Sequence, residues 1–142
     1  MTIYLLDENV LRELRPGGNA HVQAWYATVS LRIGALTFFE KRRGAARLRK
    51  TDPDRATRLL AGIDALEAAY GSRLIPVDGP VVAEWTRLRG AKDKNQRDRA
   101  LAATARVHGF VLVTRNVADV TGCANVEVVQ QLLSKARCNP ID

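Results

Sequence analysis

Ile3-Tyr4-Leu5-Leu6-Asp7-Glu8-Asn9-Val10-Leu11 is the stretch that decides the fold. Its four leading apolar residues show no polar alternation, which predicts a strand buried on both faces. An acidic residue ends the run, and a helical pattern follows directly. In an open parallel α/β sheet, ligands bind at the carboxyl ends of the strands. Asp7 is therefore a candidate site residue, although helix capping by Asp7 or Asn9 is the simpler explanation when the stretch is taken alone.

Strands alternate with helices along the rest of the chain. Further strands are expected at 31–36, 74–77, 110–114 and 126–129. The helices between them have recognisable starts: a capping-box pattern at Thr37, Asp52-Pro53, Asp78-Gly79-Pro80, and a small-residue helix from Asp98 to His108. The alternation predicts an α/β fold with a mainly parallel sheet of four to five strands, as a single domain over residues 1–142.

The charge balance favours a polyanionic partner. The chain has 22 Lys and Arg against 15 Asp and Glu, a formal net charge of +7. A basic excess attracts nucleic acid by neutralising phosphates. Six of the ten residues from 41 to 50 are cationic, and Arg42, Arg43 and Arg47 are candidates for contact with an RNA backbone. A solvated helix face explains these arginines about as well.

Composition excludes several other classes of protein. Of the 142 residues, 46% are hydrophobic, which is typical of a soluble globular protein. No apolar run approaches the roughly 20 residues that cross a membrane, and no secretory leader is recognisable. Cys123 and Cys138 lack metal-binding spacing, so we expect free thiols in a reducing cytoplasm.

Four acidic residues occupy comparable places in the predicted fold. They are Asp7 after the first strand, Glu40 in the first helical turn after the second, Asp98 at the start of the small-residue helix, and Asp119 in the loop after the strand that ends at Thr114. Carboxylates gathered at one sheet edge repel unless a cation lies between them, and hard Mg²⁺ or Mn²⁺ ions prefer oxygen ligands. On a basic protein, this set suggests phosphodiester hydrolysis by activated water. Capping would also explain Glu40 and Asp98, and a turn would explain Asp119.

The sequence resembles the PIN-domain ribonuclease toxins of the VapC group, from bacterial type II toxin–antitoxin pairs. The matching stretches lie in the same order over nearly the whole chain: 5–11, 35–44, 98–109 and 112–119. The resemblance implies a PIN-like three-layer α/β/α fold. It also implies an endoribonuclease that leaves 5′-phosphate and 3′-hydroxyl ends, works as a homodimer, and is neutralised by a small antitoxin with a DNA-binding domain.

By the same resemblance, Asp7, Glu40, Asp98 and Asp119 form the catalytic site and hold Mg²⁺ or Mn²⁺. Asn9, Thr114 and Asn116 are expected to support that site, with Arg115 beside them.

This chain departs from the family pattern near the expected site. Glu8 occupies the place of a small hydroxyl residue, and Gly34 replaces a serine ahead of Glu40. An extra carboxylate at position 8 could raise affinity for the metal or repel RNA. One alternative is therefore a PIN-like protein with impaired catalysis that only binds RNA or antitoxin. A distant third is a phosphoacceptor receiver domain using Asp7 and Asp78, although no strand supplies the late lysine that a receiver requires.

Overall fold

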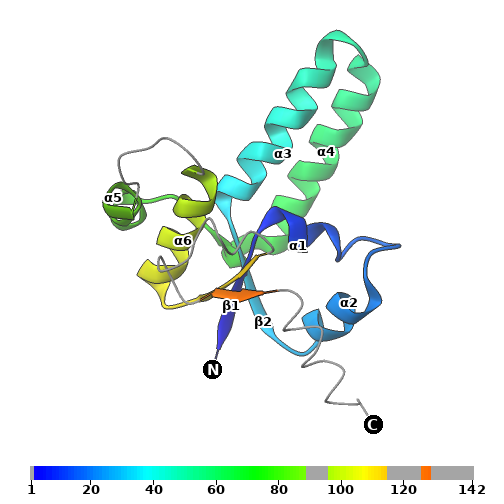
Figure 1. Cartoon of the computed structure of the whole chain (residues 1–142). Coiled ribbons are helices and arrows are strands. Elements are labelled where there is room, and N and C mark those ends of the chain that lie inside the picture. The colour runs from blue at the N-terminus through cyan, green and yellow to red at the C-terminus, as the bar shows by residue number, and fades with distance from the viewer. Residues whose placement is uncertain (1, 89–95, 115–125, 129–142) are drawn as a thin grey trace.

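The computed structural model describes residues 2–88, 96–114 and 126–128. Strands and helices alternate as the sequence predicts (Figure 1). In chain order the elements are β1 (Ile3–Leu6), α1 (Glu8–Arg12), α2 (Ala20–Tyr26), β2 (Ser30–Gly34), α3 (Ala35–Arg47), α4 (Pro53–Tyr70), β3 (Leu74–Ile75), α5 (Gly79–Leu88), α6 (Gln96–His108), β4 (Val111–Thr114) and β5 (Val126–Val128). Short 3-10 turns at 48–50 and 71–73 follow α3 and α4.

The sheet has five strands in the order β3-β2-β1-β4-β5, and each of these pairings is parallel. Strand β1 lies at its centre, which explains why its residues are apolar without alternation. Strand β3 lies at an edge, where the nearby Pro76 removes no ladder hydrogen bond. The predicted α/β class with a parallel sheet of four to five strands is confirmed.

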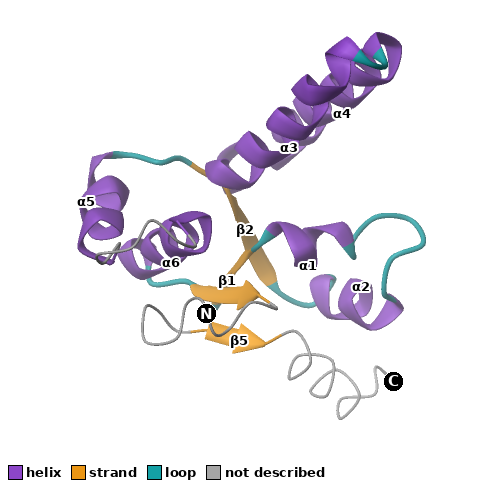
Figure 2. Cartoon of the chain, turned by 45° about the horizontal axis from the view of Figure 1, so that its top comes forward, coloured by secondary structure: helices purple, strands orange, loops and turns teal. Residues whose placement is uncertain are grey.

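Neighbouring residues of the central strands point to opposite faces of the sheet and build two cores. Leu6 pairs in register with Ile33 and Val113, and these three belong to a core shared with helices α1 to α4. Leu5 pairs with Leu112, and both pack on the other face against α6. Helices α1 and α2 therefore lie on one side of the sheet and α5 and α6 on the other (Figure 2). The expected three-layer α/β/α arrangement is confirmed.

Helices α3 and α4 form a hairpin that projects away from the sheet (Figure 1). Asp52 is the N-cap of α4, because its side chain accepts a hydrogen bond from the backbone N–H of Arg55 at 3.2 Å. Gly71 ends α4 with a φ of 53°, a conformation that favours glycine. Buried Ala45 and Ala56 have short side chains that allow the two helices to pack closely. The predicted start of α4 at Asp52-Pro53 is confirmed.

An acidic cap and a glycine also bound the helices α5 and α6. The Asp78 carboxylate accepts a hydrogen bond from the Val81 N–H at 3.2 Å and caps α5, which packs against α6. Gly109 ends α6 with a φ of 70°. Trp25 is a core residue, whereas Trp85 is half-buried and donates from its indole nitrogen to the Gln96 side chain. In the described ranges, no helix is both long and apolar enough to cross a bilayer.

The junction between β2 and α3 differs from the prediction. The strand ends at Gly34 rather than Leu36, and the helix begins at Ala35 rather than near Thr37. A Cβ atom on Gly34 would lie 3.0 Å from Cδ2 of Leu101, so glycine at this position allows α6 to approach the sheet closely. Glycine at position 34 therefore coincides with a tight contact in the core.

Gly34→Ala is expected to lower the free energy of unfolding by about 1 kcal/mol, because Leu101 must move away from the new methyl group. Gly44→Ala is the matched control, since Gly44 lies inside α3 with open space around it. That change should raise stability by up to about 1 kcal/mol through helix propensity. Urea unfolding of both variants measures the difference, and stabilisation by Gly34→Ala would contradict the argument.

Candidate functional site

The Asp7 carboxylate connects three elements at the carboxyl edge of the sheet. Asp7 is 4% exposed, and its Oδ1 accepts a hydrogen bond from the Val10 N–H at 3.0 Å, which caps α1. Its Oδ2 accepts a hydrogen bond from the hydroxyl of Thr114 at the end of β4, 107 residues away in the sequence. The Asp7 N–H donates to the carbonyl of Val113. Capping by Asp7 is thus real, but it uses only one of the two carboxylate oxygens.

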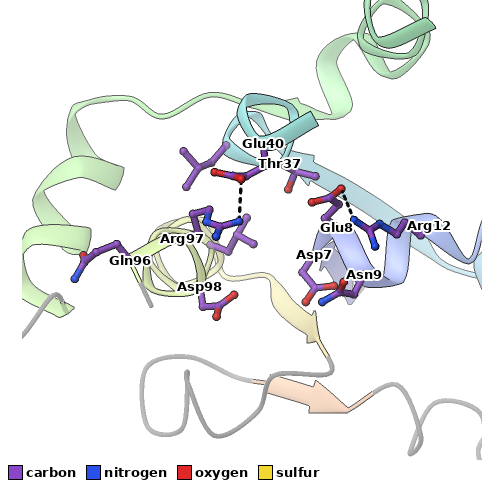
Figure 3. Close-up of a pocket in the computed structure, with 11 residues that line it drawn as sticks. Asp7, Glu8, Asn9, Arg12, Thr37, Glu40, Gln96, Arg97 and Asp98 are labelled. Atoms are coloured by element: carbon purple, nitrogen blue, oxygen red, sulfur yellow. Dashed lines mark hydrogen bonds and ion pairs between the residues drawn. The ribbon is translucent and has the colours of Figure 1, made fainter. Parts of the chain in front are cut away.

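A pocket of about 500 Å³ opens beside Asp7 (Figure 3). Its walls come from the start of α1, the first two turns of α3 and the start of α6. The residues that line it are Asp7, Glu8, Asn9, Arg12, Leu36, Thr37, Glu40, Gln96, Arg97, Asp98 and Leu101. Three of the four predicted site acids, Asp7, Glu40 and Asp98, therefore reach one pocket from three separate segments of the chain.

Glu40 is not part of a capping box, and that expectation is wrong. Gly34 is the N-cap of α3 and makes no side-chain capping bond, so Thr37 and Glu40 both lie inside the helix. The Glu40 carboxylate instead forms an ion pair with Arg97, with 2.9 Å between Oε2 and Nη1, and a longer pair with Arg43 at 3.9 Å. Capping therefore does not explain the acid at position 40.

Glu8 is held by two cations. Its Oε1 lies 3.3 Å from Nη2 of Arg12, one helical turn later, and 4.0 Å from Nζ of Lys41 on α3. Burial lowers the pKa of the Lys41 ammonium below its ordinary value, and the negative charge of Glu8 opposes that shift. The extra carboxylate is therefore largely neutralised where it lies, with less charge left to repel a phosphate.

The remaining predicted residues divide between the described and undescribed parts of the chain. Asn9 lines the pocket, and Thr114 is buried against Asp7. Asp98 lies in the first turn of α6, which begins two residues earlier than predicted, at Gln96. Asp119, Asn116 and Arg115 lie outside the described residues.

The donor chemistry of the pocket fits a hard divalent cation. Asp7, Glu40, Asp98 and Asn9 offer only oxygen or amide groups, without a thiol or imidazole. The buried Thr37 hydroxyl, which lacks a hydrogen-bond partner among the described residues, adds another oxygen in the pocket. Within the described ranges, no three acidic, histidine or cysteine side chains are close enough to hold one ion together. Arg97 supplies the positive charge at Glu40.

The three arginines predicted to contact RNA lie in different environments. Arg42 forms ion pairs with Asp64 and Glu67 of α4, with Nη2–oxygen distances of 2.6 and 2.9 Å. Hydrogen bonds to Glu67 and Asp64 raise its already high pKa further. Arg42 thus joins the two helices of the hairpin. Arg43 and Arg47 are exposed on α3 and remain the freer candidates.

Two residues of the pocket, Thr37 and Arg97, are not among the site residues that the sequence predicts. The sequence predicts a capping role for Thr37, because the predicted helix begins two residues after the observed start at Ala35. With the observed start, Thr37 and Glu40 are three residues apart within one helix and share a face. Arg97 could not be connected to Glu40 from the sequence, because their pairing depends on how α6 lies against α3.

A protein-family model matches most of the chain. The family model described as PIN domain matches residues 4–118. A search of curated proteins gives no match. The family match excludes the receiver-domain alternative.

The similar solved structures share most of their length with this chain. FitAB bound to the IR36 DNA fragment is 28% identical with a TM-score of 0.71, covering 88% of this chain and 94% of that one. FitAcB from Neisseria gonorrhoeae is 30% identical with a TM-score of 0.69, covering 88% and 95%. A toxin–antitoxin complex from Klebsiella pneumoniae shares the fold at 22% identity and a TM-score of 0.60, covering 87% and 95%.

Arg97→Gln is expected to strengthen the binding of Mn²⁺ about two- to fivefold, because a cation no longer competes with the guanidinium for Glu40. Isothermal titration with Mn²⁺ measures the affinity. The matched control is Arg87→Gln, which removes the same charge from an arginine paired with Glu84 on α5. Equal or weaker binding in Arg97→Gln, compared with that control, would contradict the competition.

Proposed function

The chain belongs to the PIN-domain family, whose members are typically nucleases, and from this premise we propose that it is a metal-dependent endoribonuclease toxin. Its reaction is the hydrolysis of RNA phosphodiester bonds. One observation carries the proposal: the carboxylates of Asp7, Glu40 and Asp98, from three separate elements, line one pocket. The net charge of +7 on the same chain favours a polyanionic substrate.

In this proposal Asp7, Glu40, Asp98 and the predicted Asp119 hold Mg²⁺ or Mn²⁺. When bound, such an ion supplies an activated water nucleophile and stabilises charge on the leaving oxygen. The contribution of the protein is to hold these carboxylates in position. The Asp7 carboxylate is fixed from two sides, by the Val10 N–H and the Thr114 hydroxyl, so it loses little side-chain freedom on binding an ion.

Glu40 has a second role in the proposed reaction cycle. Without a bound ion, Arg97 neutralises this acid at the rim of the pocket, where the arginine is 61% exposed. Glu40 would hold the ion together with the other acids, and the guanidinium of Arg97 would then be free to pair with a substrate phosphate. The same would hold for Arg43, the more distant partner of Glu40.

RNA would continue from the pocket along the exposed side of α3. Phe39, Arg43 and Arg47 are spaced four residues apart and therefore share one helix face. Phe39 is 55% exposed, an unusual position for an aromatic ring, and a base can stack on it. The two arginines can pair with the phosphates that follow. In this proposal Arg42 supports the hairpin, and Asn9 and Thr114 support the site beside Asp7. A supporting role is proposed for Asn116 as well.

The expected partners follow from relatives that have been crystallised as toxin–antitoxin complexes, some of them bound to DNA. We propose that a small antitoxin with a DNA-binding domain neutralises this protein and that the protein forms a homodimer. The alternative of a PIN-like protein that binds without cleaving has one observation in its favour. Among the described residues, the carboxylates do not gather closely enough to share an ion.

Asp7→Asn is expected to abolish Mg²⁺- or Mn²⁺-dependent cleavage of total RNA, with a loss of at least about 100-fold, because the first metal ligand loses its charge. Asp78→Asn is the matched control, since Asp78 caps α5 outside the pocket and asparagine caps equally well. The control should cleave like the wild type. Equal cleavage by Asp7→Asn and wild type, or no cleavage by either with any divalent metal, would leave the binding-only alternative.

Arg47→Gln, made in the Asp7→Asn background to prevent cleavage, should weaken binding of single-stranded RNA without changing the melting temperature. Loss of one phosphate contact reduces the slope of log affinity against log salt by about 0.7. Fluorescence polarisation at several salt concentrations measures that slope. Arg42→Gln is the comparison, and it should lower the melting temperature by breaking the hairpin ion pairs. An unchanged slope in Arg47→Gln would remove Arg47 from the RNA surface.

A further inference from the structure

Thr37 is a buried residue that lines the pocket, and its hydroxyl has no partner among the described residues. It lies in the first turn of α3 and is 4% exposed. Among the described residues, no donor or acceptor forms a hydrogen bond with its Oγ1 atom. The same side chain lines the pocket, beside Glu40 on α3 and facing the segment that carries Asp7 and Glu8 (Figure 3).

Other buried threonines of this protein use their hydroxyl groups. Thr104, in the middle of α6, donates to the carbonyl of Ala100 at 2.9 Å, and Thr114 donates to Asp7. Threonine hydroxyls in helices commonly form the bond that Thr104 forms, to the carbonyl four residues earlier. Thr37 makes no such bond, although leaving a buried hydroxyl unpaired is costly. Its hydroxyl therefore still has a hydrogen bond to make, on a side chain that lines the pocket.

We propose that the Thr37 hydroxyl is a further oxygen of the divalent-cation site, where it forms a hydrogen bond to a water molecule of the bound ion. The inference rests on the proposed function and adds a residue to it. Mg²⁺ keeps several of its waters when it binds to proteins, and groups that bond to such waters fix their orientation. The neighbouring pocket groups of Asp7, Glu8 and Glu40 are carboxylates, which accept hydrogen bonds when ionised. A hydroxyl can both donate and accept, so Thr37 can bond to a coordinated water and orient it.

This role explains why a costly side chain is kept at position 37. Valine has nearly the same shape as threonine and would remove the unpaired hydroxyl. The metal-free protein should therefore be more stable with valine, whereas the cation should bind less tightly. A residue with a purely structural role would not give these two opposite changes.

The test uses Thr37→Val and the full chain. In EDTA, Thr37→Val should raise the melting temperature by about 3 °C, because the unsatisfied hydroxyl is gone. Titration with Mn²⁺ should show affinity lowered by about tenfold or more, the range typical of groups that orient metal ligands. Thr37→Ser restores the hydroxyl and should recover most of the affinity. Thr104→Val is the matched control, because it removes a buried but satisfied hydroxyl, and its Mn²⁺ affinity should match the wild type.

The outcomes separate this inference from the proposed function. Unchanged Mn²⁺ affinity in Thr37→Val, in a protein that otherwise binds Mn²⁺ and cleaves RNA, overturns the role of Thr37 alone. A lower melting temperature with unchanged affinity shows that the hydroxyl is satisfied structurally, and it overturns the inference as well. Failure of the wild type to bind Mn²⁺ and to cleave RNA overturns both.

Discussion

The bonds of the Asp7 side chain are the constraint on which the rest of the site depends. One oxygen caps α1 and the other accepts from Thr114, so a single buried carboxylate joins the central strand, the first helix and the end of β4. Those elements come from opposite ends of the described chain. The parallel order of the strands makes this possible, because it places the ends of β1 and β4 at the same edge of the sheet.

Paired charges compensate the acids that gather at that edge. Arg97 and Arg43 lie at Glu40, while Arg12 and Lys41 lie at Glu8. Each pair is partly exposed, so its contribution to stability is small and it can exchange partners at little cost. The basic excess of the chain therefore has two consequences: it compensates the acids of the pocket, and it places partly exposed arginines at the pocket rim.

The sequence was sufficient for features that depend on local chemistry. The central strand followed from Ile3–Leu6, and the start of α4 followed from Asp52-Pro53, because caps and apolar runs act over a few residues. The predicted start of α3 is two residues too late, because Thr37 and Glu40 fit a capping box that the fold does not use. Ion pairs such as Arg42 with Glu67 or Arg97 with Glu40 depend on helix packing, which no local pattern encodes.

The charge on Asp7 is itself an argument for a cation. Asparagine could form hydrogen bonds with the same two groups, because its oxygen could cap α1 and its amide could donate to Thr114. Burying a carboxylate is more costly than burying an amide, even when both of its oxygens accept hydrogen bonds. Glu40 supports the same reasoning, since it caps nothing and depends on arginines for compensation. Two acids that face one pocket and that capping does not fully explain are therefore the side chains on which the proposed metal site depends.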